Sequence, residues 1–161
     1  MRKIICNTSP LQYLHQAGRL DLLRALAGNV TVPQGVIAEL DAGRRLGLDL
    51  PKPETLPWVR VETPLALAAL PLARDLGEGE SQVLALALEH GPDVVVILDD
   101  MLARQMAKTL RVAHVGTLGI LVQAKAAGLI PSLAPILNQL DALGFRLAAK
   151  TRQAVLELAG E

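Results

Sequence analysis

Polar residues with metal-binding or hydrogen-bonding side chains follow several short apolar runs of this sequence. Asn7 follows the first run, Asp99 and Asp100 follow the most hydrophobic one, and Thr117 comes just after the last. In an open parallel α/β sheet, ligands bind outside the carboxyl ends of the strands. We therefore expect these polar turns to converge on one crevice. There, Asp99 and Asp100 are either acids that begin a helix and favour its dipole or carboxylates that bind a metal ion.

Glu80 lies on a predicted helix and belongs to its apolar face. With Val83, Leu84 and Ala87 it follows the i, i+3, i+4, i+7 spacing of one helical stripe. A carboxylate that points inward needs a partner, because an isolated buried charge is very costly, and a metal ion is one such partner. The alternative is an acid that stabilises the first helical turn. Glu39, on another predicted helix, is by itself a surface acid.

Other polar residues have a structural explanation when each is taken alone. Asn7 is typical of a turn, and Thr117 is typical of a helix N-cap. Arg104 and Lys108 are four residues apart and form a small basic face near the acidic pair, which is either solvated or a binding face. The three histidines lack metal-ligand spacing and there is one cysteine, so we expect no zinc site. No Ser-His-Asp or Cys-His nucleophile is indicated.

The composition indicates one folded domain spanning residues 1–161. The chain is 51% hydrophobic and 20% charged, which excludes a disordered chain, and its single cysteine excludes a disulfide scaffold. No apolar stretch reaches the ~20 residues of a membrane span, and no secretory signal is evident. We therefore expect a cytoplasmic protein without membrane contact. The net charge is zero and only three residues are aromatic, so composition alone supports neither a basic nucleic-acid surface nor a base-stacking platform.

Strands and helices are expected to alternate along the chain. Strands are predicted at residues 4–6, 30–32, 58–61, 94–98 and 112–115. Helices are predicted at 9–17, 20–27, 33–40, 64–74, 78–90, 101–110, 117–127, 132–143 and 151–159, with a loop over 43–57 that can include one short helix. The strands are continuous apolar runs without alternation, which indicates burial on both faces. This pattern predicts an α/β fold with three layers: a central parallel sheet of four or five strands between helices, and extra C-terminal helices.

A series of short motifs runs along nearly the whole chain. They are Asn7-Thr8-Ser9-Pro10, residues 18–23, Val32-Pro33 with residues 36–40, Gly77-Glu78-Gly79-Glu80-Ser81, Leu98-Asp99-Asp100, Gly116-Thr117-Leu118-Gly119 and residues 126–132. Each motif is weak by itself, but their combination and order are specific. Together they resemble the PIN-domain nucleases, and most closely the bacterial and archaeal VapC-like branch that opens with an Asn-Thr-Ser-Pro turn.

The resemblance implies metal-dependent cleavage of single-stranded RNA. Its acidic cluster carries over to Asn7, Glu39, Glu80 and Asp99, with Asn7, Glu80, Asp99 and Asp100 as the ligands of Mg²⁺ or Mn²⁺. Hard oxygen ligands suit such a metal, which activates water for attack on a phosphodiester. Thr8, Ser9, Arg104 and Thr117 are the implied substrate-binding or orienting residues. Many relatives are toxins of toxin–antitoxin pairs, so the resemblance also implies a cognate antitoxin protein, and we expect a homodimer.

The sequence departs from the family pattern at the first acidic position. Active PIN nucleases usually carry Asp there, whereas this chain carries Asn7, which offers a carbonyl oxygen but no charge. The intact Glu39, Glu80 and Asp99 favour an active nuclease. Asn7 favours the alternative, a catalytically weak PIN-fold protein that binds nucleic acid or a partner without cutting. Another doubly wound enzyme, such as a phosphatase, needs a nucleophilic Asp where Asn7 stands.

Overall fold

Five parallel strands form the centre of the molecule, in the spatial order β3-β2-β1-β4-β5. The computed structural model describes residues 2–66 and 75–161. The strands are β1 (Lys3–Cys6), β2 (Val30–Pro33), β3 (Val59–Glu62), β4 (Val94–Ile97) and β5 (Ala113–Val115). They are rich in β-branched residues, which pack well on a pleated surface. The edge strand predicted near residue 60 is confirmed as β3.

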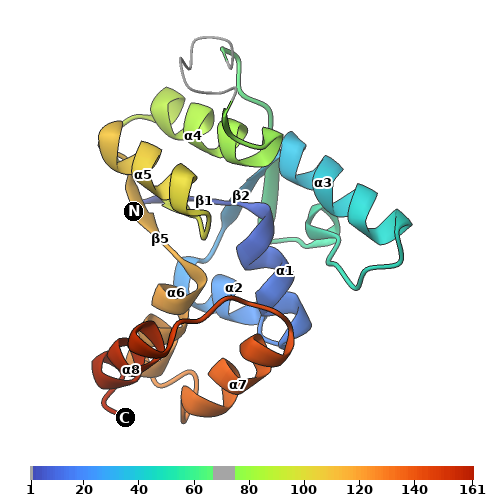
Figure 1. Ribbon diagram of the computed structural model, residues 1–161. Helices are drawn as coiled ribbons and strands as arrows, with labels where there is room; N and C mark the ends of the chain where they lie inside the picture. Colours follow the sequence, from blue (N-terminus) through green and yellow to red (C-terminus); the bar gives the residue numbers. More distant parts are fainter. Residues whose placement is uncertain (1, 67–74) are drawn as a thin grey trace.

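Helices cover both faces of this sheet, which confirms the predicted three-layer α/β/α fold (Figure 1). Helix α4 packs against β1, β2 and β4, while α5 packs against β5; α2 contacts β2 and α6. The helices are α1 (Thr8–Gln16), α2 (Asp21–Ala27), α3 (Gln34–Arg45), α4 (Glu78–His90), α5 (Met101–Thr109), α6 (Thr117–Ala126), α7 (Ala134–Ala142) and α8 (Ala149–Leu158), with a 3-10 turn at Pro53–Thr55. Within the described ranges, no helix is long and apolar enough to span a bilayer.

Some predicted boundaries were wrong. Helix α1 begins at Thr8 with Asn7 as its N-cap, one residue before the start predicted at residue 9. Helix α3 continues past Gly43 to Arg45, into the segment predicted to be a loop. The helix predicted at 64–74 falls mostly outside the described residues, and the part that is described, residues 64–66, is not helical.

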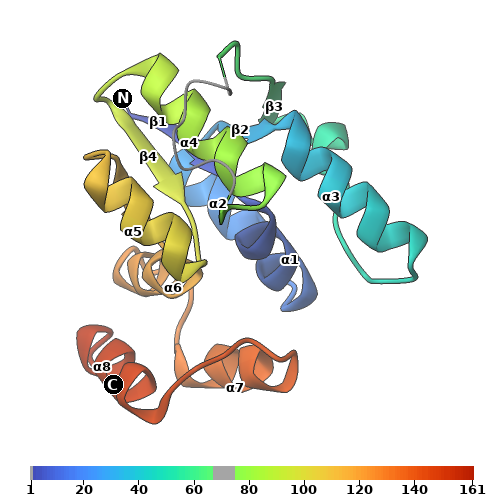
Figure 2. The same ribbon diagram turned by 45° about the horizontal axis from the view of Figure 1, so that its top comes forward.

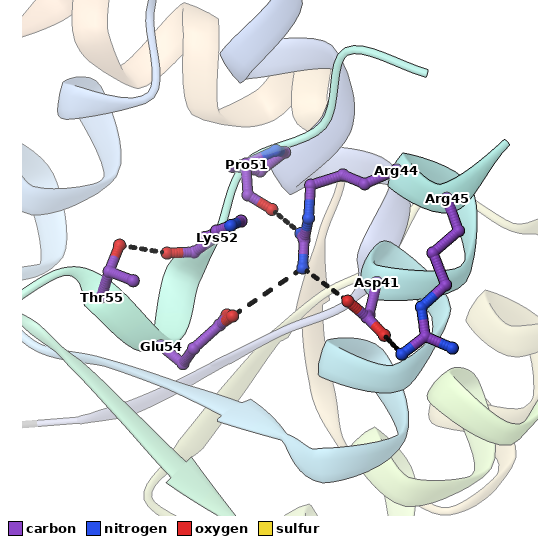
Figure 3. A network of polar contacts seen from close by, with 7 residues as sticks. All are labelled: Asp41, Arg44, Arg45, Pro51, Lys52, Glu54 and Thr55. Atoms are coloured by element: carbon purple, nitrogen blue, oxygen red, sulfur yellow. Dashed lines mark hydrogen bonds and ion pairs between the residues drawn. The ribbon is translucent and has the colours of Figure 1, made fainter. Parts of the chain in front are cut away.

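Arg44 explains why α3 extends further than expected. Its guanidinium donates to the carbonyl of Pro51 and lies 3.3 Å from the carboxylate of Asp41 and 3.8 Å from that of Glu54 (Figure 3). Arg45 forms a second ion pair with Asp41 at 2.9 Å. These contacts fasten the connection after α3 to the last turn of the helix. They therefore fix the helix that carries Glu39.

Gln82 fixes the position of α3 relative to α4. Its Oε1 accepts a 2.7 Å hydrogen bond from the backbone N–H of Gly35 in the first turn of α3, where the preceding Pro33 offers no side-chain cap. A Cβ on Gly35 would lie 2.8 Å from the Gln82 side chain, so glycine permits the close approach. Burial makes this bond costly to lose, because an unpaired buried amide costs about 1–3 kcal/mol. The N-terminus of α4 is thereby held beside Glu39.

Helices α7 and α8 form a C-terminal unit below the sheet layers (Figure 2). Their apolar side chains join the common core, and Leu133, Leu137 and Leu140 are fully buried. The carboxylate of Glu161 accepts hydrogen bonds from the backbone N–H of Leu133 at 2.7 Å and from the Lys125 ammonium at 2.9 Å. Together with a bond from Ser132, these contacts lower the pKa of Glu161 to about 2. They connect the end of the chain to α6 and to the start of α7.

Candidate functional site

The topology brings the predicted polar turns to one edge of the sheet. Strands β1, β4 and β5 are adjacent and parallel, so their carboxyl ends point the same way. Asn7 comes directly after β1. Asp99 comes two positions after the last residue of β4, and Thr117 is the first residue of the helix after β5. Hydrogen bonds join Thr117 and Ser9 to Asp99, and Asn7 and Asp99 line one pocket. The predicted crevice is therefore present.

Asp99 is held by three donors from two different helices. Its Oδ1 accepts the backbone N–H of Thr117 at 2.8 Å, and its Oδ2 accepts the Thr117 hydroxyl at 2.6 Å and the Ser9 hydroxyl at 3.2 Å. An ionised carboxylate has about four acceptor positions, so this arrangement leaves Asp99 able to bind one further group. Thr117 was expected to act as an N-cap, but Gly116 takes that place and the Thr117 side chain orients Asp99 instead.

Glu39 reaches the same region from the middle of α3. Its Oε1 accepts the backbone N–H of Gly79 at 2.9 Å, and its Oε2 accepts the hydroxyl of Thr8. Gly79 is buried at the start of α4, where a helix N-terminus favours a negative charge. Both carboxylate oxygens of Glu39 are thus oriented by hydrogen bonds. The interpretation of Glu39 as a surface acid was therefore wrong. Thr8 orients this acid, as Ser9 and Thr117 orient Asp99.

Asn7 carries an unsatisfied polar atom in this site. Its side chain is 1% exposed, and its Oδ1 has no hydrogen-bond partner among the described residues. A Cβ placed on Gly79 would meet Asn7 Oδ1 at 3.0 Å and Glu39 Oε2 at 2.8 Å, so the two oxygens face the same small space. Leaving a buried carbonyl unpaired costs about 1–3 kcal/mol. An oxygen in this state is suited to receive a ligand.

A pocket of about 370 Å³ opens beside these oxygens, and we call it the carboxylate pocket. Asn7, Glu80, Asp99 and Asp100 line it. Glu80 approaches Gly77 so closely that a Cβ there would overlap its carboxylate. The partly buried Glu80 lines the pocket, and its carboxylate lies against Gly77 at the N-terminus of α4, which is also the position of an acid that stabilises the first helical turn. A separate hollow of about 400 Å³ under α2 and α6 has no acidic side chain among its described lining residues.

Asp100 performs the structural role considered for it. Its Oδ2 accepts the backbone N–H of Ala103 at 2.9 Å, which makes it the N-cap of α5. Its exposed side chain also borders the carboxylate pocket. Arg104, one turn into α5, donates to the carbonyl of Leu98 at 3.2 Å and packs against Gly116 near Asp99. The cation is thus fixed beside the acid without a direct ion pair between the two among the described contacts.

The Cys6 thiol is excluded as a nucleophile. It is completely buried, and burial raises its pKa well above the ordinary value, with the nearby charge of Asp99 adding to the increase. The thiol therefore remains protonated at neutral pH and acts as a small apolar side chain. The chemistry of the site rests on its oxygen atoms.

The oxygen atoms of Asn7, Glu80 and Asp99 meet some of the requirements for binding a hard divalent cation. Among residues 2–66 and 75–161, no group of three or more His, Cys, Asp or Glu side chains is arranged to hold a metal ion. Mg²⁺, however, binds through one or two carboxylates and keeps several waters. The unpartnered Oδ1 of Asn7 beside Asp99 and Glu80 supplies that kind of donor set.

Several residues at the site were not predicted from the sequence. Tyr13 on α1 and Phe145 after α7 form an edge-to-face pair with ring centroids 4.9 Å apart. Both line the carboxylate pocket, together with Arg146. Gly79 is the other missed residue. Gly79 could have been predicted, because it is a glycine between two glutamates at the start of a helix. Phe145 and Arg146 could not, because they come from a segment without any local motif.

Comparison with protein families places these residues in a known context. A family model described as a PIN domain matches residues 3–161, a range that includes all of the predicted site residues. No curated protein matches the chain.

Proposed function

The chain belongs to the PIN-domain family, and from that membership and the oxygen-rich site we propose that it is a metal-dependent endoribonuclease that hydrolyses single-stranded RNA. PIN domains are generally nucleases. The observation that carries the proposal is the buried, unpartnered Oδ1 of Asn7, which faces the same space as Glu39 and borders the same pocket as Glu80 and Asp99.

We assign the ligands of a Mg²⁺ or Mn²⁺ ion to Asn7, Glu80 and Asp99, with Asp100 at the rim. When bound, the ion lowers the pKa of a coordinated water and stabilises charge on the phosphate oxygens. The residues of the chain provide orientation. Thr117 and Ser9 hold the Asp99 carboxylate in one rotamer, and such supporting hydrogen bonds increase the precision of a metal site.

Glu39 and Arg104 have separate tasks in this proposal. Glu39, held by Thr8 and the Gly79 N–H, places a second negative charge behind Asn7. Its remaining acceptor positions can hold a water proton. Arg104 stands on the other side of Asp99, where a guanidinium can bind a non-bridging phosphate oxygen. In this proposal, a scissile phosphate binds between the carboxylates and Arg104.

The biological setting we propose is a VapC-like toxin paired with an antitoxin protein. The support is the order of motifs from Asn7-Thr8-Ser9-Pro10 onward, and the antitoxin and a homodimer stay predictions. Growth arrest on expression in a bacterial host, relieved by the product of a neighbouring short gene, is the expected result. Normal growth with abundant soluble protein would contradict the toxin role.

A second candidate function is supported by two observations. No group of three acidic, His or Cys side chains that could hold a metal ion is found in the described part of the chain, and Asn7 brings no charge. This favours a protein with the same fold that binds nucleic acid or a partner without cutting it. The two candidates differ in one measurable property, which is metal-dependent cleavage.

The test combines cleavage with metal binding. We expect labelled single-stranded RNA to be cut with Mg²⁺ or Mn²⁺ and to remain intact with excess chelator, while calorimetry shows Mn²⁺ binding. Asp99→Asn loses both cleavage and binding, whereas Asp93→Asn, an exposed acid before β4, retains both. Cleavage that persists in chelator would contradict the metal mechanism. Absence of cleavage with either metal would favour the binding-only alternative.

A further inference from the structure

A basic groove of about 710 Å³ adjoins the carboxylate pocket and shares a wall with it. Asp99, Phe145 and Arg146 line both hollows. The groove continues from Asp99 along α5 and past the end of β5, where Arg104, Lys108 and His114 line it. The two hollows are therefore neighbouring parts of one surface, with the segment after α7 at their junction.

The groove concentrates positive charge in a protein whose net charge is zero. Arg104, Lys108 and Arg146 face it, and Asp99 is the one acid among its described lining residues. Lys108 and Arg146 are exposed, and neither forms an ion pair with any described residue. Cations that lack an internal partner are available for an anionic ligand.

The backbone after α7 places Arg146 in a defined position. Gly144 adopts φ +88°, and its N–H donates to the Asp141 carbonyl at 3.1 Å, while the Phe145 N–H donates to the Leu140 carbonyl at 2.9 Å. These two bonds form a Schellman motif, which ends a helix and fixes the direction of the following chain. The ring of Phe145 then packs against Tyr13 on α1. The C-terminal unit is thus anchored to the sheet domain directly beside Arg146.

We propose that the basic groove is the path of the substrate strand and that Arg146 and Lys108 bind its phosphates on one side of the cleavage position. The two cations and Arg104 line a single surface that ends at Asp99. A nucleic-acid strand carries a negative charge at each phosphate, so its charges repeat along such a groove. Contacts with these phosphates dominate the affinity of proteins for nucleic acids. The inference rests on the proposed function for the cleavage step, but binding to the groove is measurable without it.

The experiment measures binding of a short fluorescein-labelled single-stranded RNA of mixed sequence by anisotropy, in chelator and over a range of NaCl concentrations. Arg146→Ala and Lys108→Ala are each expected to weaken binding about two- to fivefold. Each should reduce the slope of log K against log salt by about 0.7, the value for one phosphate contact with a single strand. Arg146→Lys should retain most of the slope, because the charge remains.

Arg24→Ala is the matched control, since Arg24 is an exposed cation on α2 that lines neither hollow. It should leave affinity and slope unchanged. Unchanged affinity and slope in both Arg146→Ala and Lys108→Ala would overturn the proposal. Equal affinity for a polyglutamate peptide, lost in the same variants, would also overturn it in favour of an acidic protein partner.

The two proposals fail in different ways. Wild-type binding with the expected slope, but without cleavage in Mg²⁺ or Mn²⁺, would contradict the nuclease function and support the groove. Cleavage by Arg146→Ala with an unchanged KM would contradict the groove and leave the nuclease function intact. If both hold, Lys108→Ala raises KM and leaves kcat close to the wild-type value, because Lys108 lines the groove and not the carboxylate pocket.

Discussion

Thr117 donates two hydrogen bonds to the same carboxylate, that of Asp99. The backbone N–H reaches Oδ1 at 2.8 Å and the hydroxyl reaches Oδ2 at 2.6 Å. A single residue at the start of α6 therefore fixes both the position and the rotation of an acid that follows β4. Because Thr117 is completely buried, its N–H and hydroxyl are shielded from water, while Asp99 itself lines the open pocket.

Thr117→Val tests the importance of this pairing. Valine has nearly the same shape and keeps the backbone bond, but it removes the hydroxyl and leaves Asp99 Oδ2 with Ser9 alone. We expect metal affinity and cleavage to fall about 10- to 100-fold, which is typical when a residue supporting a metal ligand is lost. Thr117→Ser, which keeps the hydroxyl, is the control. Wild-type Mn²⁺ binding by Thr117→Val in calorimetry would contradict the orienting role.

Gly79→Ala separates the site from the stability of the fold. A Cβ there would meet Glu39 Oε2 at 2.8 Å and Asn7 Oδ1 at 3.0 Å. Alanine favours a helix over glycine by about 1 kcal/mol, but to make room the Glu39 carboxylate must shift from its hydrogen bonds with Thr8 and with the Gly79 N–H. Because these two effects on stability oppose each other, we expect a melting temperature close to that of the wild type, together with reduced Mn²⁺ affinity and cleavage. If Gly79→Ala lost stability but kept full activity, the oxygens of Asn7 and Glu39 beside Gly79 would have no role in metal binding or cleavage.

The sheet was predictable because its strands are encoded locally. Runs such as residues 94–97 are entirely aliphatic, and in the structure they lie inside a parallel sheet. The end of α3 was not predictable, because Gly43 suggested a helix stop. The contacts of Arg44 with Pro51 and Glu54 that extend the helix come from the following connection.

The site shows the same division between local and distant signals. Asn7, Asp99 and Thr117 were predictable as neighbours, because the ends of adjacent parallel strands share one edge. The partners of these residues were not predictable. Which hydroxyl orients which carboxylate depends on helix positions, and the arrival of Phe145 and Arg146 depends on how the C-terminal unit packs. Three aromatic residues gave no indication that two of them meet beside the acids.

Glu161 predicts a specific acid dependence of stability. Its pKa is lowered to about 2 by the Lys125 ammonium and by hydrogen bonds from the start of α7. A lowered pKa in the folded state means that the ionised form stabilises the fold above the unfolded pKa, near 4.5. This contribution is lost as the pH falls from about 4.5 toward 2.

Glu161→Gln should therefore melt at a lower temperature than the wild type at pH 7. The difference should shrink between about pH 4.5 and pH 2, as the wild-type carboxylate becomes protonated. Thermal unfolding followed by circular dichroism over this pH range measures it. Glu157→Gln on α8 removes the same charge away from the start of α7 and should melt like the wild type. A difference for Glu161→Gln that does not depend on pH would contradict the assignment.

Asn7→Asp tests whether the first position of the site belongs to the metal. The substitution keeps the size of the side chain and adds one negative charge beside Glu39 and Asp99. Attraction to the cation is largely offset by dehydration and by repulsion between the acids, so we expect a net gain of about 1–2 kcal/mol, or roughly tenfold tighter Mn²⁺ binding. Without metal, the same repulsion should lower the melting temperature slightly.

Asn7→Ala, which removes the unpartnered oxygen, should weaken binding and is the control for a general effect of substitution. Unchanged or weaker Mn²⁺ binding by Asn7→Asp in calorimetry would show that Asn7 is a turn residue and not a ligand, because an added carboxylate in direct contact with the ion cannot be without effect.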